Sequence, residues 1–283
     1  MEKSALILEG GANRGIFTAG VLDYLMERNI TADYVAGVSA GACNALGFVS
    51  RQPGRTRNCI VAWNQEKMRE QMDAFRAERS VMDFRMLFDT FPNETYPFDY
   101  DTYFHSSTRC ELVVTNCLTG RAEYKKETSD RKRLMKICRA SCSIPLLSTM
   151  VEVDGIPYLD GGLADSIPVL RARKLGYKKI ILVLTQKKGY RKSISRKTMS
   201  VIRTRYRHYP EMVKATCLRP YRYNRCLDAI EKWEDAGRLF VIRPEMQPVK
   251  RLEKNTGKLE AFYDHGYEVM KKHYQEMLEY LGQ

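Results

Sequence analysis

The sequence predicts an α/β protein of three layers, with a mainly parallel sheet and helices on both of its faces. Two observations indicate this architecture. Short apolar runs typical of buried strands alternate with segments of helical periodicity, a pattern that parallel strands joined by helices produce. In addition, residues 4–15 and 33–49 each pass from a strand to a helix through a turn that contains glycine. At 283 residues with 44% hydrophobic content, the chain can bury the core that this fold needs.

The alternation places six strands and six helices. The strands are expected at residues 4–9, 34–38, 110–116, 151–159, 179–185 and 239–242. The helices are expected at about 16–28, 40–50, 128–140, 167–175, 196–215 and 256–278. Because ligands of such sheets bind at the carboxyl ends of the strands, functional residues are expected in the loops that follow them.

The first strand and its turn have the sequence "SALILEGGANRG" (residues 4–15), in which Gly10 and Gly11 permit a tight turn before a helix. Free backbone N–H groups and the positive end of the helix dipole would attract an anion here. The anion could be a phosphate or an oxyanion formed during a reaction, and a tight turn without a ligand is the alternative. A dinucleotide site is disfavoured, because Ala12 occupies the middle glycine position of G-x-G-x-x-G.

The second strand and its turn have the sequence "DYVAGVSAGACNALGFV" (residues 33–49). Residues 37–41 form a G-x-S-x-G motif between a short strand and a helix of small residues. This context is typical of a nucleophile elbow, in which the flanking glycines accommodate a strained backbone and the serine hydroxyl stands at the helix N-terminus. Ser39 is therefore the candidate nucleophile, and a serine that only caps the helix is the alternative.

A serine nucleophile needs a base, and none of the four histidines follows a strand at a turn. We expect these histidines to have surface or packing roles: His105, His208, His265 and His273. The better candidate is Asp160 in "YLDGGLADSIPV" (residues 158–169), because it follows a strand and precedes Gly161 and Gly162. A carboxylate beside the serine can accept its proton. An Asp-Gly hairpin turn is the alternative.

These three motifs together resemble the patatin-like phospholipase family, in its bacterial branch. Residues 10–15 match the family's oxyanion loop, residues 37–41 its nucleophile motif and residues 160–162 its D-G-[AG] motif. The segments "RASCSIPLL" (139–147) and "VIRPE" (241–245) are also similar to bacterial members. The resemblance covers about residues 4–275 and is weakest over 52–105 and 187–225.

The resemblance implies a three-layer patatin-like fold and a Ser–Asp dyad that hydrolyses acyl esters of lipids without a histidine, as a phospholipase A, lysophospholipase or carboxylesterase does. Ser39 would be the nucleophile and Asp160 the general base. The backbone N–H groups of Gly10, Gly11 and Ala12 would form the oxyanion hole. The supporting residues implied are Arg14, which braces the loop, and Gly15, Gly37, Gly41, Gly161 and Gly162. No cofactor and no metal are implied.

Two positions depart from the family pattern. Ala12 stands where many members have a third glycine, and Ser166 stands where many have asparagine. Ala12 fits the loop at little cost if its φ is negative. An acyltransferase that passes the acyl group from Ser39 to an alcohol or lysolipid would need the same residues, so it is the alternative activity.

The cysteines and the apolar runs bear on compartment. The eight cysteines contain no C-x-x-C pair and no Cys/His ligand spacing, and Cys43 and Cys142 lie among small or apolar residues, so free buried thiols are expected. The N-terminal apolar run is too short for a secretory signal, and no stretch reaches 18 apolar residues. We therefore expect a cytoplasmic protein, attached at most to the inner face of a membrane.

The basic charge is concentrated in one segment. Residues 187–225 contain thirteen Lys and Arg against one Glu, in a chain of net charge +13. Five tyrosines are interleaved with them, which suits an anionic membrane surface or a nucleic acid. A membrane is favoured and nucleic acid is expected not to bind. The alternatives are a basic binding protein with a vestigial site and a solvated basic face.

The domain organisation is predicted to be simple. No Pro/Ser-rich linker and no repeat divides the chain, so one domain is expected over 1–283. Its core would span about 4–185, and a helical, basic extension would span about 187–278. Residues 52–105 include the aromatic stretch "TFPNETYPFDYDTYF", which is interpreted as a lid or side wall or, alternatively, as a packing satellite.

Overall fold

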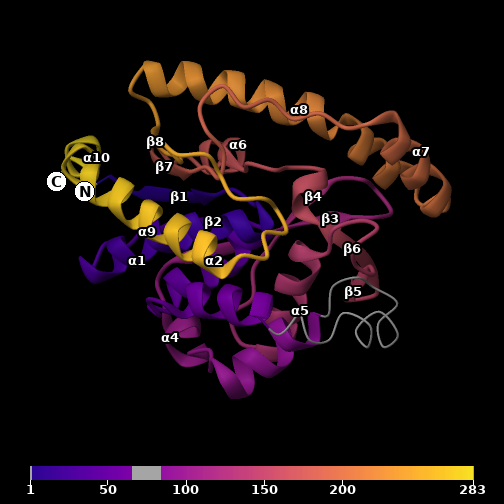
Figure 1. Ribbon diagram of the computed structural model, residues 1–283, viewed down its shortest axis with the longest axis horizontal. Helices are drawn as coiled ribbons and strands as arrows, with labels where there is room; N and C mark the ends of the chain where they lie inside the picture. The colour runs from indigo at the N-terminus through magenta and orange to yellow at the C-terminus, as the bar shows by residue number, and fades with distance from the viewer. Residues whose placement is uncertain (1, 66–83, 283) are drawn as a thin grey trace.

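The computed structural model describes residues 2–65 and 84–282 and confirms the α/β architecture (Figure 1). Within these residues, eight strands form one sheet in the order β5-β6-β3-β2-β1-β7-β8, and β4 pairs with β3 outside this path. The strands are β1 (Ser4–Leu8), β2 (Tyr34–Val38), β3 (Arg109–Asn116), β4 (Ala122–Lys125), β5 (Val151–Val153), β6 (Ile156–Asp160), β7 (Lys179–Val183) and β8 (Phe240–Ile242).

The parallel core of the sheet places a crevice beside β1. This strand lies between β2 and β7 and is parallel to both; β2 is also parallel to β3, and β7 to β8. The pairs β3–β4, β3–β6 and β5–β6 are antiparallel. The chain proceeds from β1 to β2 and β3 on one side, and later adds β7 and β8 on the other. The loops after β1 and β7 therefore diverge, which opens a crevice at their carboxyl ends.

Helices cover both faces of the sheet. The helices are η1 (Ala12–Arg14), α1 (Gly15–Glu27), α2 (Ala40–Val49), η2 (Met86–Thr95), α4 (Tyr100–His105), α5 (Arg131–Cys142), η3 (Gly161–Leu163), α6 (Val169–Lys174), α7 (Arg196–Arg205), α8 (Pro210–Asp235), α9 (Thr256–Lys272) and α10 (Tyr274–Leu281), and residues 55–65 are also helical. Figure 1 shows α6 and α8 on one face and α1, α2 and α9 on the other. No helix in the described ranges is both long and apolar enough to cross a bilayer.

The side chains of β1 show how the sequence produces these layers. Ala5 and Ile7 pack with residues of α6 and α8, whereas Leu6 and Leu8 pack with residues of α1 and α2. Successive side chains of a strand point to opposite faces, so a strand that is apolar at every position must be covered on both sides. The buried run in β1 therefore accounts for the helices on the two faces.

Several predicted elements have different bounds in the structure. The strand expected at 151–159 is a hairpin, β5 and β6, because Asp154 and Gly155 adopt positive φ angles of 53° and 76° and reverse the chain. The helix expected at 196–215 is two helices, since α7 ends at Arg205 and α8 begins at Pro210. Proline lacks the N–H that a helix interior uses, but it is well suited to the first position of a helix.

Within residues 52–105, the residues just before the aromatic stretch form a side wall, and the stretch itself (residues 90–104) is a packing element. Phe84 and Phe88 line an apolar cavity described below, so this part is a side wall. Phe91 and Tyr103 are buried in the core, so the rest is a packing element. The remainder of the proposed lid, residues 66–83, lies outside the described residues.

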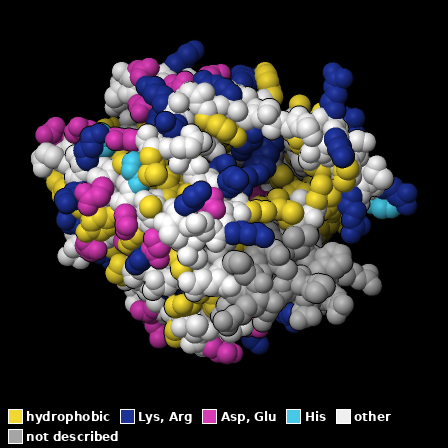
Figure 2. All heavy atoms as spheres, in the orientation of Figure 1, with side chains coloured by type: hydrophobic (Ala, Val, Ile, Leu, Met, Phe, Trp, Pro, Cys, Tyr) yellow, Lys and Arg dark blue, Asp and Glu magenta, His cyan; other side chains and the backbone are white. Residues whose placement is uncertain are grey.

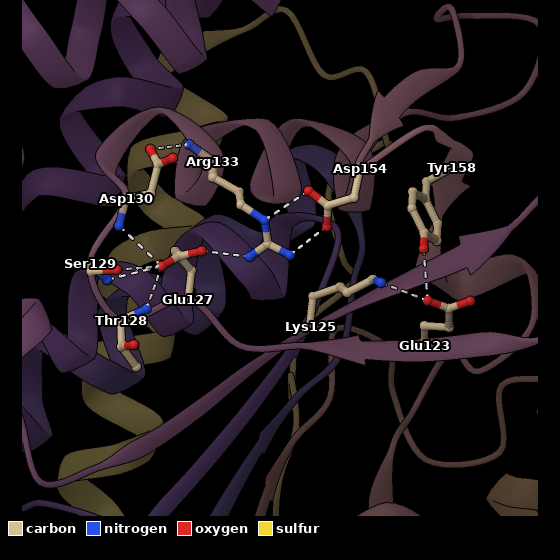
Figure 3. Close-up of polar contacts among 9 residues, drawn as sticks. All are labelled: Glu123, Lys125, Glu127, Thr128, Ser129, Asp130, Arg133, Asp154 and Tyr158. Atoms are coloured by element: carbon tan, nitrogen blue, oxygen red, sulfur yellow. Dashed lines mark hydrogen bonds and ion pairs between the residues drawn. The ribbon is translucent and has the colours of Figure 1, made fainter.

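A polar network fixes the N-terminal end of α5 to the hairpins (Figure 3). The Glu127 carboxylate accepts hydrogen bonds from the backbone N–H groups of the next three residues and from the Arg133 guanidinium. Arg133 also forms an ion pair with Asp154 in the β5–β6 turn, and Tyr158 of β6 donates to Glu123 of β4 at 2.7 Å. Burial raises the pKa of Glu127, but these hydrogen bonds outweigh it and lower the pKa to about 2.

This network predicts a pH-dependent contribution to stability. Because the folded pKa of Glu127 lies below its ordinary value of 4.5, the carboxylate stabilises the fold above that pH and loses its contribution as the pH falls toward 2. We expect Glu127→Gln to lower the free energy of unfolding at pH 7 by about 1–3 kcal/mol. The difference from wild type should shrink between about pH 4.5 and pH 2, as measured by urea unfolding.

The control for this prediction is Glu152→Gln, which changes an exposed glutamate on β5. This variant should unfold at the same urea concentration as wild type at every pH. A Glu127→Gln deficit that stays constant as the pH falls would show that shape, and not charge, is what the network requires.

Candidate active site

Ser39 lies at a strained elbow between β2 and α2. Its backbone has φ 57° and ψ −125°, a conformation that costs a non-glycine residue of order 1–3 kcal/mol and is typical of functional positions. The flanking glycines are required by close contacts: a Cβ at Gly37 would lie 2.2 Å from the Gly41 carbonyl oxygen, and a Cβ at Gly41 would lie 2.4 Å from that of Leu8. The G-x-S-x-G motif therefore forms a strained strand–turn–helix elbow, the geometry that the sequence predicts.

Ser141, at the C-terminal end of α5, holds the elbow in place. Its hydroxyl oxygen accepts a hydrogen bond from the Ser39 backbone N–H at 2.9 Å. The same hydroxyl donates to the Val113 carbonyl of β3 at 2.6 Å. Ser141 is fully buried, so each of these backbone groups would lose its hydrogen bond if the hydroxyl were absent. Ser141 lies in the segment RASCSIPLL (139–147), but no local pattern predicts this role for it.

Asp160 ends β6 on the far side of β3. Its backbone N–H donates to the Ser143 carbonyl at 2.8 Å, and its own carbonyl accepts from the Thr115 hydroxyl at 2.9 Å. One carboxylate oxygen accepts from the Gly162 N–H at 2.7 Å, while the other accepts no hydrogen bond from a described residue. The D-G-G turn thus orients the carboxylate and leaves one oxygen available.

Sheet register brings Ser39 and Asp160 to the same edge. Val38 pairs with Val113 on one side of β3, and Asp160 pairs with Val114 on the other. Both candidate residues are buried, with 7% of Ser39 and 4% of Asp160 exposed. Their side chains form no hydrogen bond with each other in this structure. Catalytic hydrogen bonds are often formed only once substrate is bound.

The glycine loop after β1 lies directly against the elbow. A Cβ at Gly10 would be 2.6 Å from the Val38 carbonyl oxygen and 2.8 Å from Ser39 Cβ, so only glycine permits this approach. The N–H groups of Gly10, Gly11 and Ala12 donate to no acceptor among the described residues. Ala12 has a φ of 50°, so the condition of a negative φ is not met and the loop is strained at this position.

The C-terminal segment clamps the same loop. The Asn13 N–H donates to the Arg251 carbonyl at 3.1 Å, and the Asn13 side chain donates to the Glu253 carbonyl at 2.8 Å. Arg14 Nε donates to the Val249 carbonyl at 2.9 Å, which gives this residue the bracing position expected of it. The loop is therefore held from a part of the chain about 240 residues away.

An apolar cavity of about 110 Å³ opens beside Ser39. Ala12 and Ala40 border it next to the nucleophile, and its wall is formed mainly by apolar side chains. These include Leu46, Ile60, Trp63, Phe84, Phe88 and Met135. A site of this kind, apolar with a few polar groups at one end, is suited to the hydrocarbon part of a ligand.

Three cysteines converge in the wall of this cavity. Cys43 lies one turn after Ser39, and its Sγ is 3.8 Å from that of Cys138 and 3.7 Å from that of Cys142. All eight cysteines are free, as expected from the sequence. The cluster could not be found by spacing, because Cys43 lies more than 90 residues before the other two. Three neighbouring cysteine sulfur atoms are ligands of the kind that soft metal ions prefer.

All four histidines are described, and none lines the cavity beside Ser39. His105 and His208 are exposed. The ring of His265 accepts backbone hydrogen bonds from the loop after β8, and His273 lies between two glutamates. These environments agree with the surface and packing roles expected from the sequence.

Comparison with known families identifies two segments. The model described as Patatin-like phospholipase matches residues 6–173, and one described as Domain of unknown function (DUF6363) matches residues 209–282. The first segment contains the glycine loop, Ser39 and Asp160. The crystal structure of VipD from Legionella pneumophila aligns over 96% of this chain and 67% of its own, with 14% identity and a TM-score of 0.41.

Two relatives align over about two thirds of this chain. An uncharacterized protein YjjU of Escherichia coli is 34% identical over 188 residues, 64% of this chain and 51% of the relative. A lysophospholipase NTE1 of Candida albicans is 28% identical over 191 residues, 64% of this chain and 13% of the relative. This chain thus spans about half of the bacterial relative and a small part of the fungal one. Since the first family model covers more than half of it, the chain belongs to the patatin-like phospholipase family.

Proposed function

We propose that the protein is a serine acyl hydrolase of lipid esters that uses Ser39 and Asp160. The observation that carries the proposal is the strained elbow, which presents Ser39 to an apolar cavity beside three N–H groups that donate to no described residue. Family membership and the naming of fungal relatives as lysophospholipases support the same reaction class. The apolar cavity would take the acyl chain.

The first half of the reaction transfers the acyl group to the enzyme. The free oxygen of Asp160 accepts the Ser39 proton as the serine oxygen attacks the ester carbonyl. The carbonyl oxygen becomes negative and is stabilised by the N–H groups of Gly10, Gly11 and Ala12, each worth about 3–4 kcal/mol in the transition state. The C–O bond to the alcohol then breaks, and the alcohol leaves with the proton from Asp160.

The second half releases the acid. Asp160 accepts a proton from water, whose oxygen attacks the acyl-serine carbonyl, and the same N–H groups stabilise the oxyanion. Collapse returns the proton to Ser39 and frees the fatty acid. If an alcohol or lysolipid takes the place of water, the identical steps produce a new ester, so the acceptor decides between hydrolysis and acyl transfer.

Ser39→Ala should abolish the reaction, because it removes the hydroxyl to which the proposal assigns the acyl-enzyme. The protein is incubated with mixed phospholipids and neutral esters, with and without added lysolipid, and the products are quantified by mass spectrometry. We expect wild type to release fatty acid and the variant to lose at least about 10³-fold in rate. New ester formed in preference to free acid would assign the protein as an acyltransferase.

A fluorophosphonate probe provides the control for this assignment. It should label wild type and Ser148→Ala, which changes a buried serine whose hydroxyl has no hydrogen-bond partner in residues 2–65 and 84–282, but not Ser39→Ala. Labelling of Ser39→Ala at a different serine would show that the nucleophile is elsewhere.

Asp160→Asn should remove turnover while leaving the fold intact, because the amide retains the acceptor for Gly162 N–H but cannot take up the serine proton. Each of His105, His208, His265 and His273 replaced singly by alanine should retain most of the activity. The measurement is kcat/KM on a soluble ester, with circular dichroism to confirm folding. Loss of turnover in a folded single-histidine variant would indicate a histidine base.

An anionic membrane surface is the proposed site of action. The basic segment is not one continuous face, because Lys192 and Arg219 line an internal cavity and Arg191 pairs with Asp228 and Glu231. The exposed basic side chains that support membrane attachment lie on and next to α7, at the end of the molecule shown on the right of Figure 1. They are Arg196, Lys197, Arg203, Arg205 and Arg207.

Exposed apolar side chains accompany these charges. Val201 of α7 is 45% exposed and Leu146 is 38% exposed. The Leu146 N–H donates to the Tyr206 hydroxyl, which ties this loop to the end of α7. Cations interleaved with apolar side chains suit the interface of an anionic bilayer.

Binding to anionic liposomes should decrease as salt rises, since the Debye length is only about 10 Å at 0.1 M. Reversal of Arg203, Arg205 and Arg207 to glutamate should weaken co-sedimentation, because each cation contributes roughly 1 kcal/mol at such a surface. The matched control reverses three exposed lysines elsewhere, Lys126, Lys174 and Lys178, and should bind as wild type does. A protein that ignores these liposomes at low salt but retards duplex DNA or RNA in a gel would contradict the membrane proposal.

A further inference from the structure

A second cavity of about 490 Å³ lies on the other side of the glycine loop from the apolar cavity. Its floor includes Gly10 and Gly11, which follow β1, and Thr185 and Gln186, which follow β7. This is the crevice between the diverging loops of the sheet, the place where α/β sheets bind ligands. Ile144 lines both cavities, so the two are adjacent, and Ser39 lines the apolar one.

Four cations from separate parts of the chain line this second cavity: Arg14, Lys192, Arg219 and Arg251. Figure 2 shows Lys and Arg side chains gathered in the central hollow of the molecule, below α8. None of the four forms an ion pair with a carboxylate of the described residues. We call the cavity lined by these four residues the basic cavity.

The contacts of these cations are to neutral groups. Arg219 Nε contacts the Ser166 hydroxyl at 3.4 Å, and Lys192 Nζ lies 3.7 Å from the centre of the Tyr223 ring. Arg14 Nε donates a hydrogen bond to the Val249 carbonyl. Each group thus retains hydrogen-bond donors for an additional acceptor.

Two carboxylates attract the basic side chains of the cavity, but they do not neutralise all of the positive charge. Glu9 lines the cavity, but its carboxylate already accepts hydrogen bonds from Thr185 N–H, Thr185 Oγ1 and the Tyr223 hydroxyl at 2.7, 3.0 and 2.6 Å. Asp160 is the other. Four positive charges against two negative ones leave an excess of two.

Burial and mutual repulsion change the pKa values of the basic side chains in this cavity. Burial lowers the pKa of Lys192, and repulsion from Arg219 and Arg251 lowers it further. Burial also lowers the pKa of Arg219; attraction to Asp160 opposes this shift, and repulsion from Arg251 adds to it. An anion bound between these groups would relieve the repulsion and replace the water that the cations lost on burial.

We propose that the basic cavity binds a phosphate group of the ester substrate, and that Lys192, Arg219 and Arg251 make the enzyme select phosphate-bearing acyl esters over uncharged ones. Guanidinium groups match the oxygen geometry of phosphate, and an ammonium adds a third source of donors. The inference rests on the proposed function, because the ester must lie at Ser39 with its acyl chain in the apolar cavity and its phosphate in the basic one.

All three selecting residues lie outside residues 6–173, where the patatin-like model matches, and two of them lie in the segment of unknown function at 209–282. The C-terminal part of the chain thus supplies the headgroup side of the site, while the dyad comes from the N-terminal part. The same segment that clamps the glycine loop also lines the cavity beside it.

The test compares two esters that differ only by the phosphate, 1-hexanoylglycerol 3-phosphate and 1-hexanoylglycerol. The short chain keeps both monomeric in solution. We expect wild type to favour the phosphate ester in kcat/KM by at least about tenfold, and Lys192→Gln and Arg251→Gln each to reduce this ratio by about tenfold. The matched control, Arg225→Gln, removes an exposed cation from α8 outside the cavity and should keep the wild-type ratio.

A binding experiment separates a substrate headgroup from free phosphate. Ser39→Ala protein is titrated by calorimetry with sn-glycerol 3-phosphate and with inorganic phosphate, alone and with Lys192→Gln added, after thermal unfolding shows that each variant is folded. Weaker glycerol 3-phosphate binding in the double variant supports the proposal. Binding of inorganic phosphate together with an unchanged ester ratio would assign the cavity to free phosphate and overturn the headgroup assignment.

The two proposals fail in different ways. If wild type hydrolyses both esters equally and Lys192→Gln does not change the ratio, the subsite is wrong and the hydrolase stands. If wild type hydrolyses neither ester, the proposed function is wrong for these substrates. The calorimetric experiment then still tests whether the basic cavity binds phosphate. Binding that is lost when Lys192→Gln is added supports a phosphate site, and binding of neither glycerol 3-phosphate nor inorganic phosphate overturns the proposal.

Discussion

The hydroxyl of Ser141 is the contact on which the geometry of the site depends. It lies between the elbow and the sheet, accepting from the Ser39 N–H and donating to the Val113 carbonyl. Two residues later, the Ser143 carbonyl accepts from the Asp160 N–H. The end of α5 therefore fixes the positions of both members of the proposed dyad, and the polar network at its other end ties the helix to the hairpins. Since the two side chains form no hydrogen bond with each other, their spacing is set by this shared support and by strand register.

The glycine loop is confined from two sides. The elbow presses against it so closely that only glycine fits at position 10, and the segment around residues 249–253 accepts hydrogen bonds from Asn13 and Arg14. Such confinement explains how Ala12 persists at a positive φ, because strain of this size survives only where neighbouring contacts leave no alternative. An oxyanion site benefits from the same rigidity, since donors that are already aligned need no reorganisation during the reaction.

Much of the fold, and the turns that carry Ser39 and Asp160, could be predicted because their signals are local. The strand–glycine–helix segments at 4–15 and 33–49 each carry their own turn chemistry, and Asp160 is marked by the glycines that follow it. The supporting contacts were not predictable in this way. Ser141 is one serine among several until β3 and the elbow meet it. The prediction of one helix at 196–215 was wrong, because a new helix begins at Pro210. The proline is visible in the sequence, but the helical periodicity continues across it.

The basic segment, residues 187–225, is a second case in which the sequence alone does not show where side chains lie. Counting residues 187–225 gives a large excess of cations, but it does not show which side chains turn inward. Lys192 and Arg219 face the cavity, while acids of α8 beyond residue 225 pair with Arg191 and Lys188. One compositional signal therefore divides into an internal site and an exposed surface, and only tertiary structure separates the two.

The clamp on the glycine loop also governs when the site can exist during biosynthesis. The hydrogen bonds from Asn13 and Arg14 close loops of 240 and 235 residues, and β1 is flanked by a strand that begins at Lys179. Contacts this distant in sequence form late and make folding slow. While the ribosome has released only the first two hundred residues, Ser39 and Asp160 are already translated but the acceptors for the loop are not. Assembly of the proposed oxyanion site must therefore wait for the last quarter of the chain.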